Sequence, residues 1–300
     1  MNWRLVFVFC QSSFLIGAFD GSPFLLGALG PAASSAFHRQ YREGETLKYH
    51  MKGKNEAWQY EIEASGVVKK NAAGIFFEEI GWSDLHTGGT ALPIPPESAA
   101  FRQELSLDPA FGMKLPDFSR VSPLLIGPMA DLMTFYSDLW LAGKAGNLAK
   151  VGDHAYIPIG GPNSWADGSR VILGQDSIDF DLTFKEIDQS GQVVKLIVRH
   201  VPPKEPKIKL PAEWMKKPVT DTPNNWVEVE RNGDKYVAEV GKETFEVEII
   251  VSLRDGRLLS ATLDNPVTAI RRECSDAALT NCSEVKPREI LRQITVRLIE

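Results

Sequence analysis

Alternation of apolar and polar residues with a period of two runs through most of this chain. In ETLKYHM, residues 45–51, leucine, tyrosine and methionine occupy every second position. AWQYEIEA, residues 57–64, repeats the pattern with tryptophan, tyrosine and isoleucine. Successive side chains of a β-strand point to opposite faces, so this period predicts strands with one buried and one exposed face. We therefore expect a mainly β protein.

The segments between the alternating runs favour antiparallel neighbours. Asn232-Gly233 separates two such runs, and Asp255-Gly256 separates two more. These dipeptides supply the positive φ angles that tight β-hairpins require. The closing segment EILRQITVRLI, residues 289–299, again gathers apolar residues on one face. The pattern predicts an antiparallel curved sheet or half-barrel.

One segment departs from the period of two. In residues 128–142 the apolar residues recur at intervals of three and four, which predicts a helix. Pro128 suits a first turn and Gly143 suits a stop. The apolar stripe consists of Met129, Leu132, Met133, Tyr136, Leu139 and Trp140. We expect this stripe to pack on the sheet. The alternative is a lid over a ligand cavity, which Tyr136 and Trp140 would then line.

The first 36 residues have the order of an export signal. MNWRLVFVFCQSSFLIGAF combines one early positive charge with an apolar run, and small residues at Ser34 and Ala36 suit cleavage before Phe37. The run is short and interrupted, which disfavours a membrane span. An uncleaved anchor is the alternative. We expect a secreted or periplasmic protein that does not span the membrane once the signal is removed.

The mature chain, residues 37–300, is expected to form a single β-rich domain. A proline-dense connector at residues 202–223 cannot lie within a central strand. We expect it to join two halves of one sheet. Trp214 within the connector and Trp226 just after it are expected to pin it to that sheet.

Two cysteines lie close together near the C-terminus. With Cys10 inside the expected signal, the mature chain keeps Cys274 and Cys282. A pair with a short polar spacer in an exported protein predicts a local disulfide, worth roughly 2.5 kcal/mol in the chain-entropy model. Two free thiols are the alternative. A metal site would need further cysteines or histidines nearby.

Charge and motifs exclude several classes of function. The formal net charge is −6 and no basic stripe is concentrated enough to favour nucleic acid. The sequence contains no nucleophile elbow, no phosphate-binding glycine loop, no H-E-x-x-H and no dinucleotide fingerprint. We therefore expect no cofactor, no metal site and no catalytic residue, and the pattern favours a protein that is not an enzyme.

The segment GQDSIDFDLTF, residues 174–184, is the strongest argument for an enzyme. Asp179 and Asp181 alternate with apolar residues and so share one face of a strand, with their Cα atoms about 6.5–7 Å apart. Such a pair could bracket a scissile glycosidic bond or bind calcium, although the calcium-loop signature is absent. We expect a solvated polar face instead, balanced by Lys185 or by an arginine of the next strand.

A few residues are candidates for ligand binding. Trp165 and Asp167 lie at the tip of a turn-rich segment, where an aromatic ring beside a carboxylate can hold a polar ring. The alternative is that Trp165 packs on the sheet and Asp167-Gly168 only makes the turn. His200 ends an apolar strand before two prolines. The candidates are Trp165, Asp167, Tyr136, Trp140, His200 and Trp226.

The order of these segments resembles a known family. YREGETLKYHMKG, residues 41–53, follows an export signal and precedes antiparallel strands, a helical segment and hairpins. This layout resembles secreted half-barrel β proteins of the LolA-like lipoprotein-carrier type. The insertion at 86–142 and the connector at 202–223 depart from the simple carrier plan.

The resemblance implies an apolar concave sheet face closed by a helix, and binding rather than catalysis. We expect a non-catalytic carrier for an apolar or lipid-like ligand. A glycan-acting hydrolase that uses a carboxylate pair and a structural envelope protein without a ligand are the alternatives.

Overall fold

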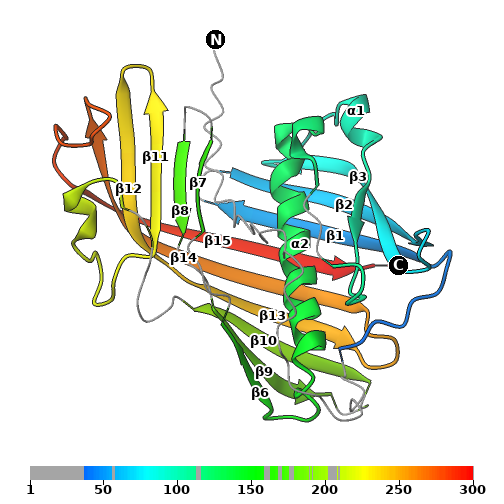
Figure 1. The fold of residues 1–300 in the computed structure, drawn as a ribbon. Helices are drawn as coiled ribbons and strands as arrows, with labels where there is room; N and C mark the ends of the chain where they lie inside the picture. Colours follow the sequence, from blue (N-terminus) through cyan, green and yellow to red (C-terminus); the bar gives the residue numbers. More distant parts are fainter. Residues whose placement is uncertain are drawn as a thin grey trace.

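The protein is described by a computed structural model. It covers residues 37–55, 58–112, 116–158, 163–167, 171–175, 179–188, 190, 192–201, 208 and 210–299. The expected export signal lies outside these residues. Within them the fold is mainly β, with an open, curved antiparallel sheet and one long helix, α2 (Pro123–Ala145), as the sequence predicts (Figure 1).

The strands follow the alternating segments of the sequence. They are β1 (Thr46–Asn55), β2 (Trp58–Lys70), β3 (Phe76–Thr87), β4 (Thr90–Ala91), β5 (Gln103–Leu105), β6 (His154–Ile157), β7 (Asn163–Asp167), β8 (Val171–Gln175), β9 (Asp179–Ile187), β10 (Val193–Val201), β11 (Trp226–Asn232), β12 (Lys235–Glu243), β13 (Phe245–Ser252), β14 (Leu258–Cys274) and β15 (Lys286–Leu298). The shorter helices are α1 (Pro96–Ala99), η1 (Phe118–Arg120) and η2 (Glu213–Lys216).

All of these strands belong to one hydrogen-bonded sheet, which divides into two arms. One side runs in the order β4-β3-β2-β1-β15-β14. The long strand β14 then pairs with β13 along its first half and with β12 along its second half. The first arm continues from β13 to β10, β9 and β6, and the second continues from β12 to β11, β8 and β7. Figure 1 shows the two arms diverging from β14.

A proline inside β14 marks the point at which the arms separate. Pro266 pairs with Leu291 of β15, and its carbonyl accepts the N–H of Thr244, which lies between β12 and β13 (3.2 Å). In an antiparallel strand the N–H and C=O of one residue point to the same side. The missing N–H of Pro266 therefore faces the gap between the arms, where it removes no ladder hydrogen bond.

The helix α2 is longer at both ends than the expected 128–142. Ser122 caps it by accepting a hydrogen bond from the N–H of Leu124 (3.4 Å), and Pro123 occupies the first turn. Gly146, with φ 67°, ends it. The expectation for Pro128 was wrong, because this proline lies inside the helix. The sequence offers two prolines for the first turn, Pro123 and Pro128. The helix begins at Pro123, because the residue before it, Ser122, can cap the helix.

One cluster of buried apolar side chains joins α2 to the face of the sheet on which it lies, here called the inner face. Five residues of the expected stripe are buried in it: Met129, Leu132, Met133, Tyr136 and Leu139. Trp140 is partly buried and packs against the same cluster. The prediction that this stripe packs on the sheet is confirmed. The helix is buried on further sides too, since Phe135 and Asp138 are also fully buried.

The connector packs on the opposite, outer face of the sheet. On β14, Leu263 belongs to the inner cluster, whereas Ile270 and Cys274 have the opposite parity and contact a second cluster. This cluster includes Met215 of η2 in the connector. The connector joins β10 to β11, which are strands of the same sheet.

The disulfide between Cys274 and Cys282 is present, as the spacing predicts. The two cysteines face each other in an antiparallel bridge. Trp214 of the connector donates its indole N–H to the carbonyl of Leu279, inside the loop that the disulfide closes (3.0 Å). Trp214 therefore pins the connector to the sheet, as expected.

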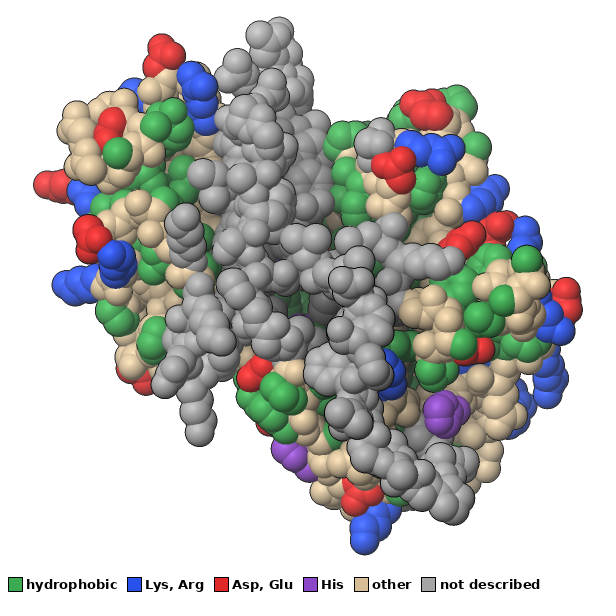
Figure 2. All heavy atoms as spheres, viewed as in Figure 1, with side chains coloured by type: hydrophobic (Ala, Val, Ile, Leu, Met, Phe, Trp, Pro, Cys, Tyr) green, Lys and Arg blue, Asp and Glu red, His purple; other side chains and the backbone are tan. Residues whose placement is uncertain are grey.

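Acidic and basic side chains are interspersed around the edges of the sheet on the face that carries α2 (Figure 2). The described helices include none that is long and apolar enough to cross a membrane.

Replacing Leu132 by alanine is expected to lower the free energy of unfolding by about 2–5 kcal/mol, because a fully buried leucine leaves a cavity. Leu132 is 0% exposed, whereas Leu291 on β15 is 50% exposed and serves as the matched control. Leu291→Ala should change the unfolding free energy by less than about 0.5 kcal/mol. Denaturant unfolding measures both. An unchanged midpoint for Leu132→Ala would show that α2 does not pack on the sheet in solution.

Candidate functional site

The buried surface of α2 carries three ionisable side chains among its apolar residues. Asp131, Tyr136 and Asp138 are 2%, 1% and 0% exposed. Each of them is hydrogen-bonded to side chains of the sheet. Together these three helix contacts, as we call them, attach α2 to β1, β2, β3, β10 and β15.

Asp131 contacts two strands. Its Oδ2 accepts a hydrogen bond from the Tyr60 hydroxyl of β2 (2.6 Å), and its Oδ1 pairs with the Arg292 guanidinium of β15. Burial raises the pKa of Asp131, and Arg292 and Tyr60 oppose that rise. The Tyr60 ring lies over Gly53 of β1, where an added Cβ would come within 2.1 Å of the ring. Glycine at position 53 is therefore required for this contact.

Tyr136 contacts β1 and β3. Its hydroxyl donates to Glu78 Oε2 and lies 3.1 Å from the Tyr49 hydroxyl. Arg39 Nε lies 3.7 Å from Glu78 Oε1 and is the nearby compensating charge. Burial raises the pKa of Glu78 to about 7, because Arg39 and Tyr136 only partly offset desolvation of the carboxylate.

Asp138 contacts β10 through His200. Its Oδ1 lies 2.8 Å from His200 Nε2, and both side chains are buried. The rings of Phe180 and Phe245 flank the imidazole at centroid distances of 4.6 and 5.0 Å. Burial raises the pKa of Asp138, and His200 acts against that rise. His200 is thus held between a carboxylate and two aromatic rings.

A further buried charge cluster lies on the second arm. Glu239 of β12 pairs with Arg271 of β14 (3.1 Å) and with Arg288 of β15. Burial, and next the charge of Glu239, raise the pKa of Glu228 on β11 to about 8. Because β11 and β12 place Glu228 directly opposite Glu239, the two carboxyl groups share the same face of the sheet.

The structure separates the candidate ligand residues. Tyr136 and His200 are both buried at the interface of α2 with the sheet. Tyr136 bonds to Glu78, and His200 bonds to Asp138. Trp140 lies at the edge of that interface, with the Lys144 ammonium 4.3 Å from its ring centroid. Trp226 belongs to a separate apolar cluster formed by β11, β14 and β15.

Trp165 lies inside β7, so its expected place at a loop tip was wrong, whereas Asp167 is the last residue of β7, where the chain turns back to β8. The segment pairs with β8 as an antiparallel hairpin, which gives it an extended backbone. Their side chains lie outside the described part of the structure. The expectation that they bind a ligand stays a prediction.

Asp131, Asp138, Glu78 and Arg292 were not among the sequence candidates. The sequence does contain a signal for Glu78 and Arg292, because each stands at a position of its strand where the alternation calls for an apolar residue. Glu78 has the parity of Ile80, and Arg292 has the parity of Ile290 and Ile294. A charged residue at such a position must find a buried partner, but the sequence does not say which.

The strand prediction for Asp179 and Asp181 is confirmed. Both lie on β9, with Phe180 and Leu182 buried on the other face. The expected solvated face was wrong for Asp179, which is buried, and both aspartates have contacts with β6. The Tyr156 hydroxyl of β6 donates to Asp179, and His154 of the same strand contacts Asp181. The hydrogen bond to Asp179 is the main cause that raises the pKa of Tyr156 to about 12.

The described residues include no group of three or more His, Cys, Asp or Glu side chains that could hold a metal ion. No family model matches the sequence, and no curated protein matches it. Any function for this chain must therefore be argued from its own geometry.

Changing Asp179 and Asp181 together to asparagine is expected to leave folding nearly intact. Asparagine keeps the shape of the side chain and can still accept a hydrogen bond from Tyr156 or His154. Thermal unfolding of the double variant checks this. A loss of hydrolytic activity towards glycans with an unchanged melting temperature would instead identify the pair as catalytic.

Glu78 is expected to make stability depend on pH. The folded protein holds its proton up to about pH 7, whereas the ordinary pKa is 4.5. Folding therefore takes up a proton between these values, and the free energy of unfolding falls as pH rises, by roughly 3 kcal/mol. The stability difference between the wild type and Glu78→Gln, measured by denaturant unfolding from pH 4 to 8, isolates this effect.

Glu79→Gln is the matched control, because Glu79 lies on the outer face beside Lys69. A constant difference between the wild type and Glu78→Gln across this range would contradict the raised pKa of Glu78.

Proposed function

We propose that this chain is a non-catalytic carrier that binds an apolar or lipid-like ligand between α2 and the inner face of the sheet. The observation that carries the proposal is the interface itself. A long helix crosses a curved sheet and is attached to it by side chains, mostly apolar, with three polar contacts among them. Separation of α2 from the sheet would expose an apolar surface without breaking the sheet ladder.

The composition of the interface supports a variable ligand. Met51 of β1 and Met129 and Met133 of α2 are all buried in this cluster. Methionine side chains are flexible and polarisable, and they adapt to differently shaped apolar partners. Such side chains can pack against the sheet when no ligand is bound and rearrange around a ligand when one is bound.

The three helix contacts support a defined closed position. Buried charge pairs add little stability compared with apolar contacts, because desolvation offsets their attraction. They do select one register, since any other would leave Asp131 or Asp138 without its partner. We infer that they return α2 to the same position after a ligand leaves.

We also propose that the protein is exported, to the periplasm or the exterior. The disulfide supports this, because such bonds persist in oxidising compartments. The order of charges and apolar residues in the first 36 positions supports it independently. A curved sheet with one helix across it is also the plan that the resemblance to LolA-like carriers implies.

Native mass spectrometry of protein purified from its own host tests the carrier proposal. We expect an added mass that disappears on denaturation, as an apolar ligand is released. In vitro, the mature chain should take up N-phenyl-1-naphthylamine with a rise in fluorescence. Met133→Ala should increase this uptake, because it opens space beside α2, whereas Leu291→Ala on the outer face should not.

The bare polypeptide mass in every native preparation, together with equal dye uptake by the two variants, would overturn the proposal. A structural protein without a ligand would then be the better description.

A further inference from the structure

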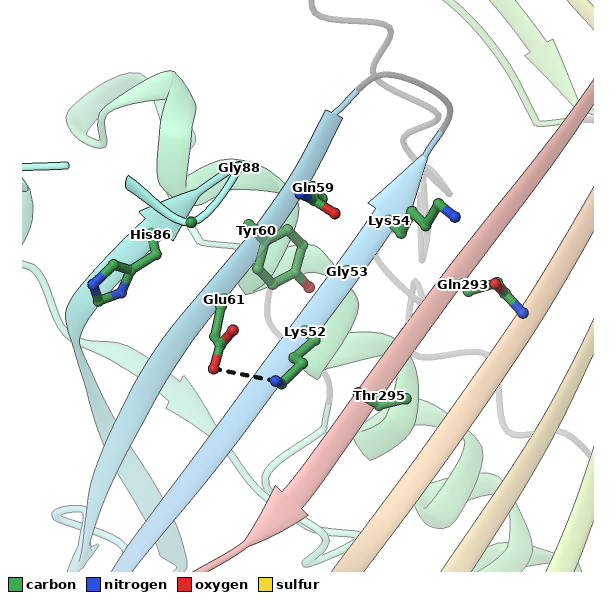
Figure 3. A pocket seen from close by; sticks show the side chains of 11 residues that line it. Lys52, Gly53, Lys54, Gln59, Tyr60, Glu61, His86, Gly88, Gln293 and Thr295 are labelled. Carbon is green, nitrogen blue, oxygen red and sulfur yellow. Dashed lines mark ion pairs between the residues drawn. The ribbon is translucent and has the colours of Figure 1, made fainter. Parts of the chain in front are cut away.

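A groove of about 500 Å³ lies on the outer face of the sheet, away from α2. It is formed by β1, β2, β15 and the turn between β3 and β4. In Figure 3, α2 is seen beyond these strands, on their far side. The volume falls within the range of small-molecule binding sites. The groove therefore lies on the opposite face of the sheet from the proposed carrier site, and Tyr60, which contacts Asp131 beneath α2, also borders it.

The strand register builds the groove from polar side chains. Lys52 of β1 lies opposite Glu61 of β2 and Thr295 of β15. Lys54, two residues further along β1, lies opposite Gln59 and Gln293. Alternate residues share a face, so ammonium, carboxamide and hydroxyl groups form one continuous surface. Gly53, between the two lysines, has the opposite parity and faces the Tyr60 ring on the inner face, so only its backbone borders the groove.

A β-bulge adds His86 to this surface. The pairing of β2 with β3 shifts register between Glu61 and Glu63, and Asp84 has φ 54°. Without the extra residue, His86 would have the parity of Trp82 and point to the buried inner face. The bulge places it opposite Glu61 instead, on the outer face. Bulges commonly re-aim side chains at functional sites.

The rim of the groove exposes backbone. Gly88 and Gly89 have φ angles of 56° and 80° and connect β3 to β4 in a two-residue turn. No atom lies within 4 Å of a Cβ built at either glycine. Both glycines are exposed and line the groove, so their backbone borders it without a side chain in the way.

The groove carries an excess of positive charge in a chain of net charge −6. Glu61 is compensated by Lys52 (3.2 Å) and by His50 (3.0 Å), and the hydrogen bond from Lys52 is the main cause that lowers the pKa of Glu61. Lys54 is exposed and forms no ion pair with any described residue. Lys54 thus stands between two carboxamides, of which that of Gln293 donates to the Asp264 carboxylate of β14 (2.8 Å).

We propose that this groove binds a small hydroxylated anion, of the size of a sugar acid or a sugar phosphate. Lys54 contacts the carboxylate or phosphate, and Gln59 and Thr295 bond to hydroxyl groups. Gln293, whose NH2 group donates to Asp264, accepts a ligand hydroxyl through its carbonyl oxygen. His86 closes the site from β3. This inference does not depend on the carrier proposal, because the two sites lie on opposite faces of the sheet.

Titration of the isotope-labelled mature chain, followed by amide NMR at low ionic strength, tests the site. The probes are glucose 6-phosphate, glucuronate and, as a neutral reference, glucose. We expect both anions, or one of them, to shift the amide signals of residues 52–54 and 88–89 and to bind at least tenfold more tightly than glucose. Which anion binds more tightly distinguishes a phosphate site from a carboxylate site.

Lys54→Gln is expected to weaken anion binding about tenfold, which is the effect of losing one charged hydrogen bond. Lys48→Gln is the matched control, because Lys48 lies on the same face of β1 but pairs with Glu63 outside the groove. His86→Ala should weaken binding several-fold without changing the melting temperature. Equal affinities of Lys54→Gln and Lys48→Gln, equal binding of glucose and the anions, or an absence of shifts in the groove would each overturn the proposal.

Discussion

The contact of Asp131 with Arg292 and Tyr60 determines where α2 can lie. A buried carboxylate is strongly unfavourable without a cation or hydrogen-bond donors. Here β15 supplies the guanidinium and β2 supplies the hydroxyl. A shift of the helix by one turn would leave both the carboxylate and the guanidinium buried without each other. The apolar side chains around this contact could tolerate such a shift, but the charges could not.

The other two helix contacts fix the direction of α2. Tyr136 reaches Glu78 on β3, and Asp138 reaches His200 on β10. These strands belong to different parts of the sheet, with β1, β2, β14, β15 and β13 between them. Anchors on both sides of β14 hold the helix across the branch of the sheet. The helix therefore also ties the first arm to the β1–β3 side.

The branch at β14 gives the molecule two different surfaces. Beneath α2 the inner face is mainly apolar, while the connector covers part of the outer face on the second arm. The outer face of β1, β2 and β15 remains polar and forms the groove. We consider the inner interface suited to an apolar ligand and the outer groove suited to an anion. The two proposals rest on the two faces of the same strands.

Two residues that the sequence singled out as ligand-binding candidates do belong to the candidate site, but as contacts between α2 and the sheet. Tyr136 and His200 were expected to face a ligand, and both lie beneath α2, bonded to Glu78 and Asp138. The partners could not be identified from the sequence, because each contact joins residues far apart in the chain. The two aspartates of β9 were placed correctly on one face, but their contacts with His154 and Tyr156 of β6 were not foreseen.

The sequence by itself determined the strands, the hairpins, the presence of a helix and the disulfide. These depend on local properties: the parity of side chains along a strand, the φ angles that glycine permits and the short loop between Cys274 and Cys282. Only the tertiary structure decided that β14 pairs with two strands on one edge, that a bulge turns His86 outward and which strand residues hold α2. Those outcomes depend on the register between distant segments, and a local pattern carries no information about which distant segment will lie beside it.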